Sequence, residues 1–469
     1  MTTARGPDAP PATALAAEQA SAVLRTLARL AWPIVVSRAT QVVVGLSDAV
    51  MVAHLGPPSL AATTTGATNS YAAFILPMGV VFVVASFSSQ LAGMGDRAGA
   101  RRYGWYGLAV AAATELAVVA ALPLVPAALA ALPYAPDVRA LLADYLRVRL
   151  LGAGAAVGIE ALASYYGGLG NTRLPMRASV AAMLLNVAGN WLLIDGHLGA
   201  PALGVRGSAL ASVAATTIAF AGLVAVFVAQ GRRQGTRRPL ALAELGRLLR
   251  FGLPSGFNWF FEFLAYAFFV NVIVTGLGTT SLAALMAVIQ LNSVAFMPAF
   301  GVASAGAILV GQAIGAERRD AVPRLVLLTF AVACGWQLLA GLAYLALPDL
   351  LLAPFARDPP SAAAFLGVAR RMLLLSAAWQ AFDAAASTMG EALRAAGDTA
   401  FVLWLRVAIA WGAFAPASWL AVRVAGGGDL AAVASLVLYL ALLAAGLFLR
   451  FRSGAWRRIR LVEPELGAA

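Results

Sequence analysis

The chain has 469 residues, of which 61% are hydrophobic and only 12% are charged. Soluble domains usually carry about 25% charged and about 45–50% apolar residues, so this composition excludes a soluble globular protein and indicates an integral membrane protein. The net charge of +12 comes from 33 basic residues, all of them arginine, against 21 acidic ones. Because the arginines gather in loops beside apolar runs, we interpret them as membrane anchors and expect no nucleic-acid partner.

Apolar runs of about 20 residues recur along the whole chain, and each is long enough to cross a hydrocarbon core of about 30 Å. We therefore predict an all-α polytopic membrane protein with about twelve transmembrane helices. The predicted spans are residues 30–53, 65–92, 105–131, 147–169, 175–196, 204–229, 251–275, 281–314, 325–351, 370–394, 400–422 and 429–450.

The distribution of arginine predicts how these spans are oriented. If both termini are cytoplasmic, 23 of the 33 arginines fall in cytoplasmic segments and eight in outer segments and their flanks, while Arg38 and Arg406 lie inside spans. Because basic residues in short loops set orientation, we predict that both termini are cytoplasmic. The arginine-rich loop 231–239 fits this role of an anchor better than the alternative, a lipid-binding cluster.

The chain also repeats itself. Six predicted spans separate the two copies, so both have the same orientation and the repeat axis lies along the membrane normal. We predict two six-helix bundles related by a pseudo-two-fold axis: an N-lobe of residues 1–230, a cytoplasmic linker of residues 231–250 and a C-lobe of residues 251–469. Such halves with a substrate site between them are a transporter architecture. The repeated motifs, 221 to 227 residues apart, are residues 29–33 and 250–254, 55–62 and 277–284, 90–93 and 312–315, and 170–172 and 397–399.

One acidic residue lies inside the first span, in Gly45-Leu-Ser-Asp-Ala-Val-Met-Val-Ala-His-Leu-Gly56. A carboxylate at that depth costs roughly 3 kcal/mol on insertion scales, which makes Asp48 a candidate functional residue. Asn186 and Asn190 share one face of the fifth span, at a similar depth. One carboxylate with two amide oxygens suits Na⁺, or a carboxylate that binds H⁺. The alternative for the asparagines is hydrogen bonding between helices, worth about 0.6 kcal/mol each.

Two further acids are predicted near the midplane of the second half. Glu262 follows Trp259-Phe-Phe, and Asp383 follows Trp379-Gln-Ala-Phe. Carboxylates among aromatic rings suit organic cations, because both groups replace the water around a positive charge. We therefore predict a substrate site at Trp259, Glu262, Trp379 and Asp383, although ordinary packing is an equally good interpretation of the two tryptophans.

The remaining charges inside spans have simpler expected roles. Glu115 and Glu160 could pair with Arg147 or Arg149, or face a water-filled cavity. Arg38 could pair with an acid or extend its guanidinium to the cytoplasmic interface, and we favour the interface.

Glu391, near the cytoplasmic end of the tenth span, is expected to be solvated. Cys334 is the only cysteine, which excludes an intramolecular disulfide.

Enzymatic functions find little support in this sequence. There is no Walker loop, no nucleophile elbow and no His/Cys cluster, so neither ATP-driven transport nor covalent catalysis has visible machinery. A polytopic enzyme acting on lipids would need a catalytic cluster at one interface, which we do not find. The energy for transport must then come from an ion gradient or from the gradient of the substrate.

Several of these motifs together resemble the multidrug and toxic compound extrusion (MATE) transporters. The similarity covers about residues 25–450. Besides the repeat, it rests on the acid within 45–56, on Gln90-Leu-Ala-Gly-Met-Gly-Asp-Arg97, on Gly168-Leu-Gly-Asn-Thr172 and on Leu393-Arg-Ala-Ala-Gly-Asp-Thr399.

The resemblance implies a drug/Na⁺ or drug/H⁺ antiporter of the bacterial inner membrane. Asp48, Asn186 and Asn190 match the family's N-lobe cation site, with Asp48 and Asn190 as possible Na⁺ ligands. Glu262 and Asp383 match a C-lobe cation site of NorM-type members, which favours that branch over the DinF branch. Where NorM-type members can carry a tyrosine one turn before the second acid, this chain has Trp379, which offers no phenol oxygen as a ligand.

The function expected from residues and resemblance together is the export of amphipathic, cationic compounds by alternating access. The partners are then small organic cations, Na⁺ or H⁺, and membrane lipid, and we expect a monomer without other cofactors. The alternative within the superfamily is a flippase for lipid-linked saccharides or peptidoglycan precursors. A flippase needs arginines in its cavity for the pyrophosphate, whereas the charges near the middle of these spans are mostly acidic.

Overall fold

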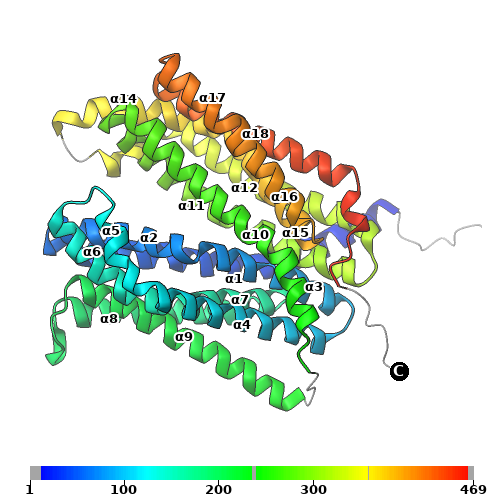
Figure 1. The fold of residues 1–469 in the computed structure, drawn as a ribbon. Helices are drawn as coiled ribbons and strands as arrows, with labels where there is room; N and C mark the ends of the chain where they lie inside the picture. The colour runs from blue at the N-terminus through cyan, green and yellow to red at the C-terminus, as the bar shows by residue number, and fades with distance from the viewer. Residues whose placement is uncertain (1–11, 235–238, 357–358, 463–469) are drawn as a thin grey trace, which may run out of the picture.

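The computed structural model describes residues 12–234, 239–356 and 359–462, and all regular elements in these ranges are helical (Figure 1). Eleven helical stretches in this part of the chain are long and apolar enough to cross a membrane. They coincide with eleven of the twelve predicted spans. The fourth predicted span, 147–169, is instead formed by the end of α6 (Pro136–Arg149), a 3-10 turn and α7 (Ala153–Gly168).

The helices form two groups that follow the repeat (Figure 1). The first half of the chain contains α1 (Ala12–Val52), α2 (Pro57–Phe82), α3 (Val84–Gly93), α4 (Arg97–Ala121), α5 (Val125–Ala130), α6, α7, α8 (Arg173–Ile194) and α9 (Val205–Gln234). The second half contains α10 (Leu242–Phe268), α11 (Thr279–Gly315), α12 (Val322–Ala346), α13 (Pro348–Leu352), α14 (Pro359–Ser376), α15 (Gln380–Ala395), α16 (Thr399–Val407), α17 (Ala415–Trp419) and α18 (Gly428–Arg452).

Matching glycines mark the repeat in the backbone. Gly56 immediately precedes α2 with φ 101°, and Gly278 immediately precedes α11 with φ 95°. Only glycine adopts this conformation without strain, which is why both copies keep it. Both neighbouring helices extend into the predicted linker of residues 231–250, since α9 runs to Gln234 and α10 begins at Leu242. Arg237 and Arg238 of the basic loop lie outside the described residues.

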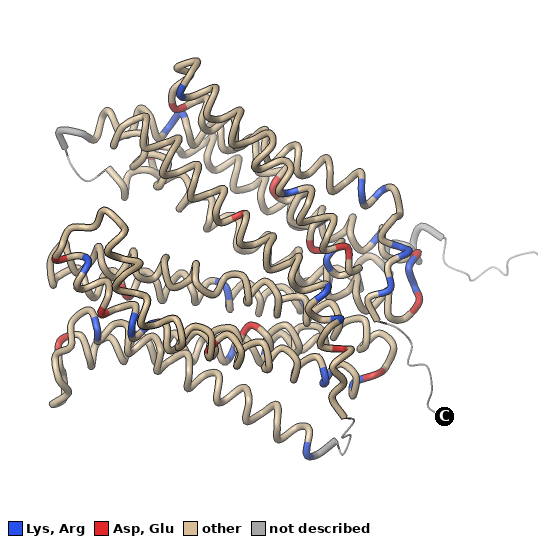
Figure 2. The backbone as a smooth tube through the Cα atoms, in the orientation of Figure 1, with Lys and Arg blue, Asp and Glu red and all other residues tan. Residues whose placement is uncertain are grey.

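The two lobes converge at the end of the molecule where α18 ends, here called the terminal end, and diverge toward the opposite end (Figure 1). Helix α2 packs against α10, while α11 packs against α1 and α3. Near the terminal end, Leu27 and Leu30 of α1 form a buried cluster with Ala305 and Ile308 of α11. Arginine residues gather at the same end, whereas the middle of the helices carries few charged residues (Figure 2).

Two glutamines from the repeated motif join the lobes there by reciprocal hydrogen bonds. Gln90 of α3 donates from Nε2 to the backbone oxygen of Ala395, at 2.7 Å. Gln312 of α11 donates from Nε2 to the backbone oxygen of Gly168, at 3.0 Å. Each glutamine therefore reaches across to the corresponding helix end of the other lobe. We call this region, where α3 crosses α11, the lobe crossing.

Glycines let the two backbones approach at the lobe crossing. A Cβ added at Gly93 would lie 2.2 Å from the backbone oxygen of Gln312. A Cβ added at Gly315 would lie 1.9 Å from the backbone oxygen of Gln90. Real Cβ atoms do not come this close to a backbone oxygen, so the crossing requires glycine at both positions.

We expect the substitution Gly315→Ala to lower thermal stability, since the added methyl group must push α3 and α11 apart. Overpacking of this kind typically costs about 1–3 kcal/mol. The unfolding midpoint of the purified protein in detergent measures the effect. Gly222→Ala in α9 is the matched control, because its Cβ would meet no atom within 4 Å. Equal midpoints for the two variants would contradict the close contact.

Candidate functional site

The three residues predicted for the N-lobe site come together around one carboxylate. Asn190 Nδ2 donates to Asp48 Oδ1 at 2.5 Å, and Asn186 Nδ2 donates to the same oxygen at 3.2 Å. Ser212 of α9, which the sequence did not single out, donates to Oδ2 at 3.2 Å. The site is therefore built by α1, α8 and α9, which enclose all four side chains.

Burial separates this carboxylate from water, and its hydrogen-bond partners are all neutral. Asp48 is only 7% exposed, and Asn190 is fully buried. No arginine forms an ion pair with Asp48 in the described part of the chain. The side-chain oxygen of Asn190 is buried and has no hydrogen-bond partner. A carboxylate beside an unpartnered amide oxygen fits a small hard cation such as Na⁺, and the carboxylate alone can take up H⁺.

Both predicted C-lobe acids line one cavity, with Trp259 in its wall. They do not contact each other directly. Glu262 of α10 forms an ion pair with Arg406 of α16, whereas Asp383 Oδ2 of α15 accepts a hydrogen bond from Gln337 Nε2 at 2.7 Å. The sequence prediction missed both partners, although an arginine inside a span was a visible signal for Arg406.

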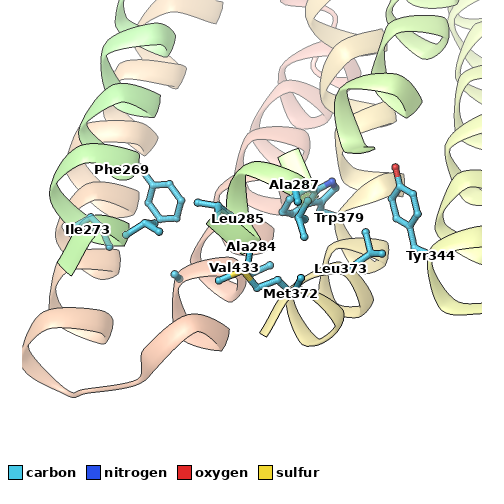
Figure 3. Close-up of a cluster of buried hydrophobic side chains, with 14 of the residues drawn as sticks. Phe269, Ile273, Ala284, Leu285, Ala287, Tyr344, Met372, Leu373, Trp379 and Val433 are labelled. Carbon is cyan, nitrogen blue, oxygen red and sulfur yellow. The ribbon is translucent and has the colours of Figure 1, made fainter. Parts of the chain in front are cut away.

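Trp379 lies outside this cavity. Its indole is 7% exposed and belongs to a buried hydrophobic cluster, in which Figure 3 shows it near Ala287. Its Nε1 donates to Asn292 Oδ1 at 3.1 Å, which satisfies the one polar atom of the ring. The structure thus supports packing, and not substrate contact, as the role of Trp379.

A second cavity lies between the lobes near the lobe crossing. The guanidinium of Arg38 forms a bidentate ion pair with Glu160, at 2.8 and 3.2 Å, so the prediction that Arg38 extends to the interface is wrong. Arg394, which also lines this cavity, forms an ion pair with Glu391. Because Glu391 is only 8% exposed, the prediction that it is solvated is also wrong.

Both arginines lie over the ring of Phe82, with centroid distances of 5.9 Å for Arg38 and 4.1 Å for Arg394. Such contacts stabilise a cation that has left bulk water.

Glu115 has a capping role that the sequence did not reveal. Its Oε2 accepts a hydrogen bond from the backbone nitrogen of Gly154, at 2.6 Å, in the first turn of α7. A carboxylate at a helix N-terminus satisfies an otherwise unpaired N–H group and interacts favourably with the helix dipole. It therefore needs neither of the arginines considered as its partners.

The sequence profile of the MatE family matches residues 33–192 and 254–420. The matched segments begin at Pro33 and Pro254, which are corresponding positions of the internal repeat. The chain belongs to the MATE family of transporters.

Curated relatives of this MATE transporter cover nearly its whole length. A protein of Pseudomonas putida described as a probable multidrug resistance protein NorM is 30% identical over 94% of this chain and 96% of that protein. A protein of Geobacillus kaustophilus with the same description is 29% identical, over 92% of this chain and 95% of that protein.

Solved structures share the fold at lower sequence identity. A multidrug resistance MATE transporter in an outward-facing conformation matches with a TM-score of 0.82 and 19% identity, over 92% of this chain and 96% of that chain. A transporter of the MOP superfamily from Pyrococcus furiosus matches with a TM-score of 0.81 and 20% identity, over 92% and 96%. Membership of this family confirms an integral membrane transporter and excludes the alternative of a membrane enzyme.

Removing one partner of the Arg38–Glu160 pair should destabilise this MATE transporter strongly. Glu160→Gln leaves a buried guanidinium without its counter-charge, which typically costs roughly 3–5 kcal/mol. The double variant Arg38→Gln/Glu160→Gln should recover most of that loss. Unfolding midpoints of the two single variants and the double variant measure the coupling. Strictly additive effects would mean that the two side chains act independently.

Proposed function

We propose that this transporter exports amphipathic organic cations by alternating access, in exchange for Na⁺ or H⁺ that enters at Asp48. The observation that carries the proposal is that this buried carboxylate has no counter-charge among its hydrogen-bond partners. Its hydrogen-bond partners Asn186, Asn190 and Ser212 are all neutral. An intramembrane acid that keeps its charge without a counter-ion is costly, so a mobile cation that neutralises it binds favourably.

The proposed orientation places the terminal end in the cytoplasm. Arginines gather at that end, and basic residues in short loops remain on the cytoplasmic side of a membrane (Figure 2). The lobes are in contact at the terminal end and diverge at the other (Figure 1), so their mutual contacts lie on the proposed cytoplasmic side.

The proposed organic cation binds in the C-lobe cavity, where Glu262, Asp383 and Trp259 provide carboxylates and an aromatic ring. The relatives described as multidrug resistance proteins support this class of substrate. Exchange then requires that a cation at Asp48 weakens binding of the substrate, and a reciprocal coupling of about 1–3 kcal/mol is sufficient.

A flippase for lipid-linked pyrophosphates is less well supported by the same cavities. The arginines of the interlobe cavity, Arg38 and Arg394, are each paired with a glutamate. They would have to give up these partners before they could bind a pyrophosphate.

Substituting Asp48 by Asn should reduce gradient-driven export at least about tenfold, equivalent to about 1.4 kcal/mol, because a neutral amide takes up no proton and gives Na⁺ no counter-charge. Efflux of a cationic dye from proteoliposomes with an imposed Na⁺ or pH gradient measures the loss. Asp195→Asn is the matched control, since Asp195 lies at the surface and pairs with His54. Gradient-driven efflux at the wild-type rate in the Asp48 variant would exclude coupling at this residue.

The wild-type protein in the same assay identifies the ion. Acceleration by only one of the two gradients assigns the coupling ion. No response to either gradient would contradict the antiporter and favour the flippase.

A further inference from the structure

The C-lobe cavity contains a cation that belongs to the protein itself. Arg406 of α16 reaches Glu262 of α10 through Nη1, and the same nitrogen lies 3.5 Å from the hydroxyl oxygen of Tyr439 on α18. The side chain of Arg406 is 13% exposed, whereas that of Glu262 is 50% exposed. The guanidinium is thus held in the wall, while its carboxylate partner remains accessible from the cavity.

The second acid of this cavity has no such partner. Asp383 accepts a hydrogen bond from the neutral amide of Gln337, and no arginine forms an ion pair with it among the residues that the structure describes. The two carboxylates that the sequence pairs as one site are therefore unequal: one is neutralised by the protein, and the other is not.

The formal charges of the wall can be counted directly. The cavity is lined by three carboxylates, Glu262, Asp383 and Glu391, and by two guanidiniums, Arg394 and Arg406. Glu391 and Arg394 form an ion pair with each other. The ionised wall therefore carries a net charge of −1, and removing Arg406 would change it to −2.

The remaining surface of the cavity suits a lipophilic ion. Trp259, Phe296 and Phe300 contribute aromatic rings to the wall. Ring faces attract a cation and bury its apolar substituents. One net negative charge among aromatic rings matches a substrate with one positive charge. A second positive charge on the substrate would be transferred out of water into a cavity that offers it no counter-ion.

We propose that Arg406 determines the charge selectivity of this transporter by neutralising Glu262, so that the C-lobe cavity prefers lipophilic monocations to dications. This inference rests on the proposed role of the cavity as the site for organic cations. Arg406 occupies the place that the second positive charge of a dication would take. Specificity then comes from a repulsive element as well as from attractive contacts.

The charge of the wall can be varied in steps at these two positions. Arg406→Gln gives a net charge of −2, Glu262→Gln gives 0, and the double variant returns to −1. Arg406→Lys keeps the charge and serves as the matched control. The probes are methyltriphenylphosphonium, a monocation, and an alkane-linked bis-triphenylphosphonium, a dication that carries the same aromatic groups.

Dissociation constants of both probes, measured by calorimetry on the purified protein in detergent, test the proposal. We expect Arg406→Gln to shift the ratio of the two constants at least about tenfold toward the dication, while Arg406→Lys and the double variant stay within about threefold of wild type. Glu262→Gln should weaken binding of the monocation at least about tenfold.

An unchanged ratio in a folded Arg406→Gln variant would overturn the proposal and would indicate a purely structural ion pair. If that variant does not fold, Glu262→Gln decides: undiminished binding of the monocation refutes the charge count, and its loss supports it.

Because binding is measured without a gradient, failure of this inference is distinguishable from failure of the proposed function. Wild-type protein that binds neither probe would refute the cationic substrate class, and the selectivity proposal with it.

Discussion

A charged side chain inside a membrane needs either an ion-pair partner or a mobile ion to bind, and this constraint determines how the interior of the protein is arranged. A lone charge at the middle of a span is costly, so each buried arginine of the described cavities has a carboxylate partner. Once these pairs are assigned, Asp48, Asp383 and Glu115 remain as acids that only neutral groups hold, and Glu115 already caps α7. Pairing therefore distinguishes the charges that stabilise the fold from those available to a mobile cation. The pairs are Arg38 with Glu160, Arg394 with Glu391, and Arg406 with Glu262.

The two lobes share a backbone but differ in their chemistry. Gly56 and Gly278 keep the same conformation before corresponding helices, and the glutamines of the lobe crossing make reciprocal contacts. The acidic residues inside the two lobes do not occupy corresponding positions of the repeat. In the N-lobe, amide and hydroxyl groups surround Asp48 in a buried site. In the C-lobe, Glu262 and Asp383 line a cavity, and Arg406 neutralises Glu262. We infer that duplication fixed the framework and that the two sites later diverged.

Hydropathy and the internal repeat were sufficient to predict the architecture, because both can be recognised along the chain without knowing how distant helices pack. The cost of an intramembrane carboxylate was likewise sufficient to select Asp48, and the helical period placed Asn186 and Asn190 on one face. Partners on other helices could not be predicted in this way. Pairing of Arg38 with Glu160, or the burial of Trp379 against Asn292, depends on how distant helices pack, and no periodicity within one helix reports that. The wrong prediction that Glu391 is solvated has the same cause. It used only the distance of Glu391 from the end of its span, and that distance does not show which residues of the other lobe cover it.

The lobe crossing is where the two cavities can influence each other. Arg394 lines both of them and also hydrogen-bonds across the crossing, to Ser86 Oγ at 3.2 Å. Opening the terminal end must break this contact together with the hydrogen bonds of Gln90 and Gln312, and it must separate backbones that only glycine allows to touch. The side-chain amides of Gln90 and Gln312 have these partners only while the lobes are closed, so an intermediate that separates the lobes part-way leaves the amides unpaired at a cost of about 1–3 kcal/mol each. Such a contact favours two discrete conformations over a continuum, which is the property that an exchanger needs to avoid a leak.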